Sequence, residues 1–328
     1  MEKNRKNKLI LNIIKSFKNK KILLIGDLIL DIYVYATAIG KSLETPTIVA
    51  KEESTKISFG GASLVARNML ELGSKVSFIS VIGDDKETEN YIKFTHKNLE
   101  KNFVIDPKRK TTIKKRFWVD GYKMLQIDNL DNRDVDKIVF KKIAEKIEKE
   151  IKKCDAVIVS DYRHGLMTKE LIEFVKKISQ KNNKKVFVDS QISHRKSIHE
   201  QYKNFFTILL SEQEAKAIDK KFKAANSDSF KELQKKLGSS NLCVKLGEKG
   251  SLGLIENKLF KTQAIKINPK DTCGAGDAFM SALAISDLLK YPEESLEIAN
   301  VWAGLSTLVH GTIPAKKQEL LNYFSGEN

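Results

Sequence analysis

Short, continuous runs of apolar residues alternate with helical patterns along most of this sequence, and the alternation restricts the folds available to it. Runs that are apolar at every position are typical of strands buried on both faces, as in a parallel sheet covered by helices. The predicted strands are residues 21–26, 76–82, 155–160, 185–189, 205–210 and 241–246. The predicted helices are residues 62–73, 86–100, 134–153, 168–182, 212–220, 229–237, 275–290 and 294–310. The sequence therefore predicts a doubly wound α/β fold with a mainly parallel sheet and helices on both faces.

Two segments interrupt this alternation. Residues 33–58 and 104–127 carry β-like patterns with few helix signals, and each lies between predicted core elements. We interpret them as strands of one small β-sheet lid, built from two separate parts of the chain and projecting from the core. Because no internal repeat or long linker divides the rest, residues 1–328 are predicted to form a single domain that carries this lid as an insertion.

Charge is the unusual part of the composition, with 58 Lys and Arg against 42 Asp and Glu and a formal net charge of +16. Such an excess suggests an anionic partner. Only seven of these basic residues are arginine, which is preferred for bidentate recognition of bases and phosphates. The lysines are interleaved with glutamates on predicted helices, as in residues 141–153. We therefore expect a solvated lysine coat and no nucleic-acid partner, and a basic nucleic-acid-binding module is the weakest hypothesis.

Cysteine usage and hydropathy bear on the compartment. The three cysteines Cys154, Cys243 and Cys273 are odd in number and widely spaced, which predicts neither a disulfide framework nor a zinc site. The basic N-terminal stretch lacks the apolar core and the cleavage site of a signal peptide. No run reaches the roughly 18 apolar residues that a membrane span needs. These observations predict a cytoplasmic protein with no membrane partner.

The segment 271–279, with the sequence DTCGAGDAF, opens an apolar helix and carries the strongest chemical signal. Small residues allow backbone N–H groups to surround an anion, and the helix N-terminus adds its positive end. Asp277 falls in the first helical turn, where its carboxylate would repel a bound phosphate unless it accepts a proton from an attacking hydroxyl. An ordinary turn with Asp277 as a cap residue is the alternative, and the complete string argues against it.

The string DTCGAGDAF resembles the DTxGAGDxF signature of the ribokinase-like (PfkB) carbohydrate kinases. The N-terminal pattern of that family is matched by residues 59–62, 65–68, 72–73 and 83–85. Within the family, the chain is most similar to the kinase domain of the bacterial D-glycero-β-D-manno-heptose-7-phosphate kinases. The segments that carry this similarity are residues 26–33, 42–47, 160–165 and 304–312. The resemblance extends from about residue 20 to about residue 315.

The resemblance implies a ribokinase-like fold, the use of ATP and Mg²⁺, and roles for individual residues. Asp277 would be the catalytic base that deprotonates the sugar hydroxyl. The backbone N–H groups of Gly274, Ala275 and Gly276 would form an anion hole around the transferring phosphoryl group. Dependence on a monovalent cation is left open.

For the sugar, the resemblance implies that Asp27 and Asp31 bind hydroxyl groups and that Gly60 and Gly61 allow the backbone to approach the substrate closely. Arg116, in the lid, is a further candidate for contact with the substrate. A cap or turn role for Asp31 and a plain tight turn for the glycine pair are the alternatives.

For the nucleotide, Lys245, Gly247 and Gly250 resemble the strand and GxxG turn that the family places beside adenine and phosphates, with a plain hairpin turn as the alternative. Glu214 stands at the glutamate of the family's NxxE element, which organises Mg²⁺, usually through water. Asn300 is a candidate for lining the adenine pocket, with a polar residue on a helix surface as the alternative.

The sugar end departs from the heptose-kinase pattern. The departures are Leu64 for an Asn that contacts the sugar, Gln126 for a lid Arg, Ser190-Gln191 for Pro-Lys, and Ser211 for the Asn of NxxE. Each lost charged hydrogen bond to a phosphorylated sugar would weaken its binding by about 1–3 kcal/mol. Other basic lid residues would offset that loss, namely Lys114, Lys115, Arg116 and Lys123.

The sequence therefore predicts an ATP-dependent kinase of a sugar or sugar phosphate. The first expectation for the substrate is D-glycero-D-manno-heptose 7-phosphate at its anomeric hydroxyl, in the synthesis of a lipopolysaccharide or capsule precursor. A kinase for a different sugar and a non-catalytic sugar or nucleotide sensor are the alternatives. No nucleotidyltransferase domain is expected in the chain, and a homodimer formed through the lid is expected from the family.

Overall fold

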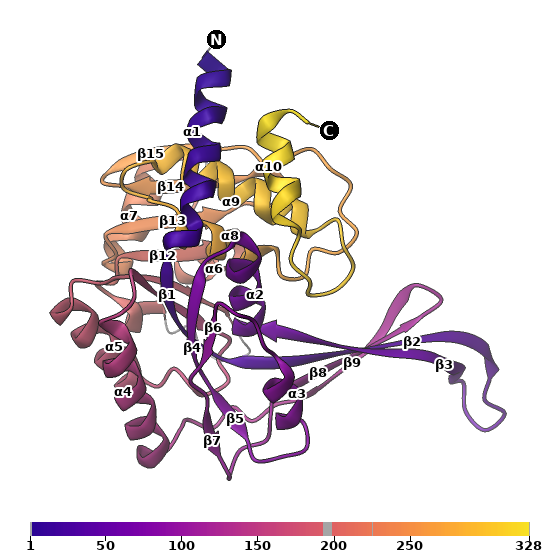
Figure 1. Cartoon of the computed structure of the whole chain (residues 1–328). Helices are drawn as coiled ribbons and strands as arrows, with labels where there is room; N and C mark the ends of the chain where they lie inside the picture. The colour runs from indigo at the N-terminus through magenta and orange to yellow at the C-terminus, as the bar shows by residue number, and fades with distance from the viewer. Residues whose placement is uncertain (1, 193–198, 225, 328) are drawn as a thin grey trace.

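The computed structural model describes residues 2–192, 199–224 and 226–327 (Figure 1). Within these residues, the body of the protein is a nine-stranded sheet with the order β15-β14-β13-β12-β11-β10-β1-β4-β6. Its strands are β1 (Lys21–Gly26), β4 (Lys75–Ile79), β6 (Leu99–Lys101), β10 (Ala156–Asp161), β11 (Lys185–Ser190), β12 (Thr207–Ser211), β13 (Asn241–Lys245), β14 (Ser251–Ile255) and β15 (Lys258–Thr262). All neighbours from β6 to β13 are parallel, and β14 and β15 continue the sheet antiparallel.

The central strands explain why the sheet needs helices on both faces. Successive side chains of a strand point to opposite faces. In β1, Ile22 and Leu24 enter one apolar core, while Leu23 and Ile25 enter the other. All four side chains are fully buried, so neither face of the strand meets solvent. This arrangement confirms the predicted doubly wound fold.

The helices divide between the two cores. One core is covered by α1 (Glu2–Ser16), α2 (Ala62–Leu72), α3 (Thr88–Lys93), α8 (Ala275–Ile285), α9 (Pro292–Ser306) and α10 (Lys317–Ser325). The other is covered by α4 (Lys137–Ile151), α5 (Lys169–Lys181), α6 (Glu212–Ile218) and α7 (Ser227–Leu237). Within the described residues, no helix combines the length and the apolar character that crossing a membrane requires.

One predicted helix is largely wrong. Residues 86–100 contain only the short α3, and their last part belongs to β6, which pairs with β4. The helix ends at Phe94, whose backbone is extended and whose ring stacks on Phe59 with ring centroids 4.8 Å apart. The predicted strand 76–82 is also divided, since β5 (Val81–Gly83) leaves the main sheet to pair with β7 (Val104–Asp106).

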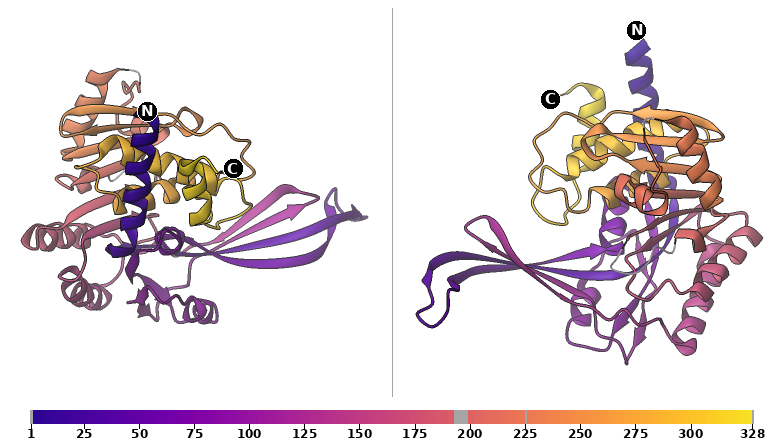
Figure 2. Two further views of the ribbon diagram at one scale, coloured as in Figure 1. Left: turned by 45° about the horizontal axis from the view of Figure 1, so that its top comes forward. Right: turned by 180° about the vertical axis from the view of Figure 1, so that it is seen from behind.

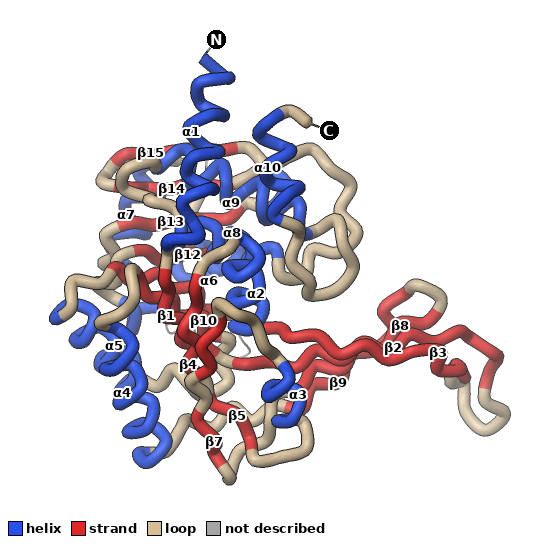
Figure 3. The backbone as a smooth tube through the Cα atoms, in the orientation of Figure 1, coloured by secondary structure: helices blue, strands red, loops and turns tan. Residues whose placement is uncertain are grey.

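A second sheet projects from the body as a long ribbon (Figures 2 and 3). Its strands are β2 (Leu28–Lys41), β3 (Ile48–Gly61), β8 (Ile113–Val119) and β9 (Tyr122–Asn129), in the order β3-β2-β8-β9. Two antiparallel hairpins, β2-β3 and β8-β9, are joined by parallel pairing of β2 with β8. The structure thus contains the small sheet expected from two separate segments, and we call it the lid.

The boundaries of the lid differ from the prediction. Its first segment begins at Leu28 and ends at Gly61, because β2 follows β1 after a single residue. Its second segment begins at Ile113, because residues 104–106 form β7 and pair with β5. The prediction of 33–58 and 104–127 was therefore too short at both ends of the first segment and misplaced at the start of the second.

Candidate active site

The predicted site residues gather at the carboxyl edge of the main sheet, where ligands bind in open α/β folds. Asp27 directly follows β1, and Tyr162 directly follows β10. Asp189 lies near the end of β11, and Lys245 is the last residue of β13. The N-terminus of α8, with Asp277 in its first turn, completes this edge.

The glycine-rich loop is built for close approach. Gly274 is the N-cap of α8 and has a φ of +85°, a backbone conformation that favours glycine. A Cβ at this position would lie 2.3 Å from Cδ2 of Leu64, which packs directly against the loop. Ala275 and Gly276 then begin the helix, so their small side chains leave its N-terminus accessible. The positive φ and the small residues are compatible with an anion hole at this loop, which stays a prediction.

Asp277 is the central acidic residue of this edge. Its Oδ1 accepts a hydrogen bond of 2.6 Å from the hydroxyl of Tyr162. Burial raises the pKa of the Asp277 carboxyl to about 7, although the hydrogen bond from Tyr162 and the charge of Lys245 act in the opposite direction. A carboxylate whose pKa lies near neutrality is suited to accept a proton in general base catalysis.

Lys245 brings a positive charge to the same place. Its ammonium group pairs with Asp189 and lies 3.3 Å from the position that a Cβ on Gly276 would take. Burial by itself would lower the pKa of Lys245, but the negative charges of Asp189, Glu214 and Asp277 raise it. The amine is therefore held in its charged form beside the glycine-rich loop.

Asp31 is almost fully buried, with 2% of its surface exposed, and both of its oxygens are engaged. Oδ1 accepts a 2.5 Å hydrogen bond from Arg116 of the lid, and Oδ2 accepts one of 3.0 Å from the hydroxyl of Thr312. A Cβ on Gly60 would lie only 2.1 Å from Oδ2, so glycine is required there by Asp31. The structure thus joins Asp31, Gly60 and Arg116 into one cluster at the base of the lid.

Asp27, which follows β1, is hydrogen-bonded to the segment that follows the neighbouring strand β10. Its Oδ2 accepts hydrogen bonds from the backbone N–H groups of Tyr162, at 2.9 Å, and His164, at 3.4 Å. Burial, together with the charge of Asp161, raises the pKa of Asp27 to about 7. A Cβ on Gly61 would lie 2.6 Å from the Asp27 carbonyl oxygen, so the second glycine also permits a close backbone contact.

The residues predicted for the nucleotide lie on two adjoining elements. Gly247 and Gly250 form the turn of the β13-β14 hairpin, with φ values of +61° and +88°. Asn300 is buried on α9 and donates hydrogen bonds to the hydroxyls of Ser251 and Thr262, so it is not a surface residue. The structure therefore shows a hairpin turn with α9 attached behind it, and the nucleotide contacts stay predictions.

Glu214 has a local structural role as well as a predicted metal role. It forms a capping box with Ser211, in which Ser211 Oγ accepts from the Glu214 N–H at 3.2 Å and Glu214 Oε2 accepts from the Ser211 N–H at 2.6 Å. Serine is as good an N-cap as the family's asparagine, which explains why α6 tolerates the substitution. Among the residues that the structure describes, no cluster of three or more His, Cys, Asp or Glu side chains could hold a metal directly.

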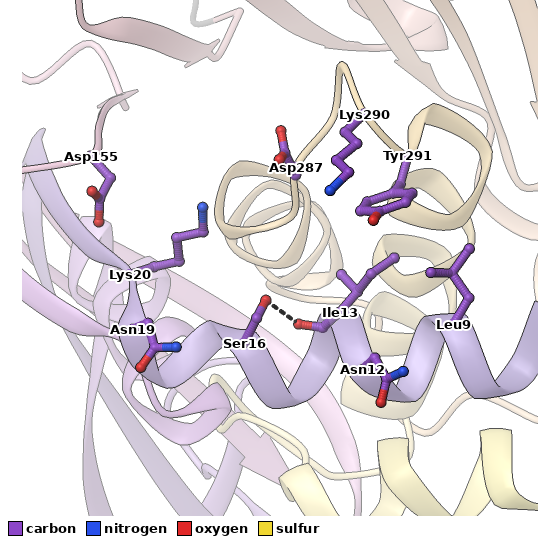
Figure 4. Close-up of a pocket in the computed structure, with 10 residues that line it drawn as sticks. All are labelled: Leu9, Asn12, Ile13, Ser16, Asn19, Lys20, Asp155, Asp287, Lys290 and Tyr291. Carbon is purple, nitrogen blue, oxygen red and sulfur yellow. Dashed lines mark hydrogen bonds between the residues drawn. The ribbon is translucent and has the colours of Figure 1, made fainter.

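A separate pocket of about 370 Å³ lies away from these residues (Figure 4). It is bordered by Lys20 and Asp155, which precede β1 and β10, and by Tyr291 at the start of α9. Because the amino ends of parallel strands lie at the opposite edge from their carboxyl ends, this pocket is remote from Asp277. None of the predicted site residues lines it.

Comparison with known proteins decides the family. A family model described as "pfkB family carbohydrate kinase" matches residues 19–319. The chain belongs to the pfkB family of carbohydrate kinases. A curated relative of this pfkB kinase, "Bifunctional protein HldE" of Aliarcobacter butzleri, is 30% identical over 317 residues. That alignment covers 94% of this chain but only 65% of the relative, so the pfkB kinase chain spans about two thirds of the relative's length.

Solved structures agree with this assignment at the level of the fold. A putative ribokinase from Agrobacterium tumefaciens has a TM-score of 0.74 and 17% identity, covering 94% of this chain and 98% of its own. An Arabidopsis thaliana ribokinase complexed with ribose and ATP has a TM-score of 0.70 and 19% identity, covering 93% and 98%. The pfkB kinase described here therefore has a ribokinase-like fold.

Two residues of the site in this pfkB kinase had no predicted role. Tyr162 reaches Asp277, and Asp189 pairs with Lys245. Both lie at the carboxyl ends of apolar strands, and that position is the signal that could have identified them. Their partners could not be read from the sequence, because Tyr162 and Asp277 are 115 residues apart.

Proposed function

We propose that this pfkB kinase transfers the γ-phosphoryl group of ATP to the anomeric hydroxyl of a phosphorylated heptose, D-glycero-D-manno-heptose 7-phosphate. The observation that carries the phosphoryl-transfer part is the position of Asp277. Its carboxylate, with a pKa raised to about 7 by burial, stands in the first turn of α8 directly after a loop shaped to receive an anion.

The chemistry follows from this arrangement. Asp277 takes the proton of the substrate hydroxyl while that oxygen bonds to the γ-phosphorus, and the bond from the γ-phosphorus to its bridging oxygen breaks to release ADP. The backbone N–H groups of Gly274, Ala275 and Gly276 would face the negative charge on the transferring group. Lys245 would add a positive charge beside the same loop.

The sugar would bind between the carboxyl edge and the lid. Asp27 and Asp31 lie there and are the candidates for its hydroxyl groups. Lys114 and Arg116 are two residues apart in β8, so their side chains lie on the same face of the lid. Arg116 pairs in register with Gln126 of β9. Arg116 thus lies across from the position where similar heptose kinases have arginine, which supports a phosphorylated substrate despite Gln126.

The nucleotide would lie along the β13-β14 turn, near Lys245, Gly247 and Gly250, with Asn300 on the helix behind it. Mg²⁺ keeps several waters and is bound through one or two carboxylates together with phosphate oxygens. Asp189 and Glu214, both close to Lys245, fit that requirement as a pair acting through water. When bound, the ion would neutralise phosphate charge.

The lid would also carry the contact between two subunits. Its exposed apolar side chains include Ile39, Ile57, Met124, Leu125 and Ile127, each at least half exposed. Exposing so many apolar side chains on a narrow sheet is unfavourable in water, and a partner that covers them would remove this cost. A second copy of this chain, packed lid to lid, is the occupant that we propose.

A substrate screen tests the proposed function. The purified protein would be given ATP, Mg²⁺ and, separately, heptose 7-phosphates, hexose phosphates and free sugars, with ADP release and ³¹P spectra as readouts. The Asp277→Asn variant, assayed in the same way, gives the background rate of ADP release. We expect heptose 7-phosphate to be the preferred acceptor. Turnover only with another sugar would overturn the substrate, and ligand-induced thermal stabilisation without any transfer would overturn the kinase activity in favour of a sensor.

A further inference from the structure

Tyr162 is held in place independently of its hydroxyl group. It directly follows β10, and its backbone N–H donates to Oδ2 of Asp27 at 2.9 Å. The next two residues are also fixed, because Arg163 N–H donates to Asp161 at 2.8 Å and His164 N–H donates to Asp27. The ring therefore projects from a backbone turn that two buried carboxylates hold rigid.

The hydroxyl of Tyr162 uses only one oxygen of Asp277. It donates to Oδ1 at 2.6 Å, and the other oxygen, Oδ2, lies 3.8 Å from the position that a Cβ on Gly274 would take. The carboxylate is thus oriented with one oxygen toward Tyr162 and the other toward the glycine-rich loop. A carboxylate that could rotate freely would present its proton-accepting oxygen to the loop for only part of the time.

We infer that Tyr162 is a positioning residue for the base: it holds Oδ1 of Asp277 so that Oδ2 faces the loop and accepts the proton of the sugar hydroxyl. This inference rests on the proposed function of Asp277 as the base. Tyr162 acts through Asp277 and exchanges no proton with the substrate.

The charges around Asp277 fit this role. Asp189 on β11 and Asp31 on β2 favour the protonated form of Asp277, while Lys245 on β13 and the hydroxyl of Tyr162 favour the ionised form. Burial and the charge of Asp277 raise the pKa of Tyr162 well above its usual value, so its hydroxyl remains a donor throughout the neutral range. Tyr162 therefore helps both to orient the carboxylate and to keep it ionised.

The lid contacts the same tyrosine. Lys114 of β8 places its ammonium group over the Tyr162 ring, 5.9 Å from the ring centroid. Arg116, two residues further along β8 and on the same face, pairs with Asp31. One lid strand thus touches both the positioning tyrosine and the acidic residue proposed for the sugar.

The test is the variant Tyr162→Phe, which removes the hydroxyl and keeps the ring. With the base less readily ionised, the acidic limb of the kcat–pH profile should move up by about one pH unit, which is a tenfold change in the ionisation equilibrium. We expect kcat to fall about fivefold near pH 7 and about tenfold below pH 6, with the loss shrinking at higher pH and KM for the sugar little changed. Replacing Tyr162 by 3-fluorotyrosine, a stronger donor of similar size, should move the limb down.

Ser77→Ala is the control. Its hydroxyl donates to another buried carboxylate, Glu150 of α4, at 3.2 Å, so the variant loses the same kind of bond away from the site. We expect its acidic limb to coincide with that of the wild type. In the Asp277→Asn background, Tyr162→Phe should cause no additional loss, because a residue that acts only through Asp277 has nothing left to position.

Two results would overturn the inference. One is a kcat–pH profile of Tyr162→Phe that coincides with that of the wild type; the other is a further loss in the Asp277→Asn background. If the wild type transfers no phosphoryl group at all, the proposed function is wrong. The role of Tyr162 can then still be tested by ¹³C NMR of the Asp277 carboxyl group. The Asp277 signal, identified by its absence in Asp277→Asn, should titrate at higher pH in Tyr162→Phe, and an unchanged midpoint would overturn the role of Tyr162.

Discussion

The carboxyl edge of the main sheet and the lid meet at one site but are held in place in different ways. Every residue of β10 is buried, whereas every residue of β9 is exposed. The strand ends that carry Asp27 and Tyr162 are therefore fixed by two apolar cores, while the lid joins the core at its base, where Asp31 of β2 accepts a hydrogen bond from Thr312 and Lys114 of β8 lies over the Tyr162 ring. We therefore expect the proposed phosphoryl transfer to depend on the core and the proposed binding of the sugar to depend on the lid.

The largest expected effect comes from a change in the core. Asp277→Asn removes the proposed base, and we expect kcat to fall by about 10²–10⁴-fold in the steady-state kinase assay. Asp287→Asn, which changes a residue lining the remote pocket of Figure 4, is the control and should leave kcat unchanged. An Asp277→Asn enzyme with nearly wild-type kcat would remove Asp277 from the mechanism.

The next largest effect should come from the base of the lid, where Arg116 of β8 pairs with Asp31 of β2. Arg116→Ala leaves the buried Asp31 without its cation, and a lost charged hydrogen bond of this kind corresponds to about 10–100-fold in kcat/KM for the sugar. We expect most of the loss in KM, because the base is untouched. The measurement is the full dependence of the rate on sugar concentration.

Arg133→Ala is the matched control for that variant. Its guanidinium also lies 2.5 Å from an aspartate, Asp131, but its side chain is 67% exposed. Exposed ion pairs contribute little, so kcat/KM should not change. A loss confined to kcat in Arg116→Ala would show that this pair serves phosphoryl transfer and not the binding of the sugar.

The lid itself is tested through its exposed apolar face. Leu125→Asp places a charge on β9, where the leucine is 53% exposed, and should weaken lid-to-lid association by about 10–100-fold, the equivalent of burying one leucine. Sedimentation over a range of concentrations measures this. Ile138→Asp, on α4 and 66% exposed, is the control. A wild-type protein that is monomeric at every concentration would contradict the dimer.

The smallest effect concerns stability. Burial raises the folded-state pKa of Asp277 to about 7, above its unfolded value, so the folded protein binds the extra proton between those two values and loses stability as pH rises through them. Asp277→Asn should therefore unfold at higher urea concentration than the wild type at pH 8, by on the order of 2 kcal/mol, and show little difference at pH 4. A difference that is equal at both pH values would mean that ionisation of Asp277 is not its source.

Sequence patterns predicted the buried parallel strands of the main sheet well and its two antiparallel strands poorly. The run at residues 21–26 became β1 without change, because a strand buried on both faces must be apolar throughout. By contrast, β14 and β15 were both missed. β15 lies at the sheet edge with lysines at Lys258 and Lys261, and β14, although buried, is only five residues long and includes Ser251 and Gly253. The start of the lid was also missed, since β2 continues the apolar pattern of β1 across Asp27.

The site shows the same division. The glycine-rich loop and Asp277 were predicted because they are contiguous, and small residues before a helix have a local physical meaning. The link from Asp31 to Arg116 was not, since the two residues meet only through the parallel pairing of β2 with β8. Arg116 was therefore predicted as a contact for the substrate, and its pairing with Asp31 is a finding of the structure.

The sequence by itself determined the doubly wound core and the loop that ends at Asp277, because apolar periodicity and small residues act over a few neighbouring positions. Only the tertiary structure decided which partners surround the base. Tyr162, Lys245 and Asp189 come from three different strand ends and meet at Asp277 because parallel strands share one carboxyl edge. The proton affinity of Asp277 depends on burial and on these charges, so it is a property of the folded protein and of no local segment.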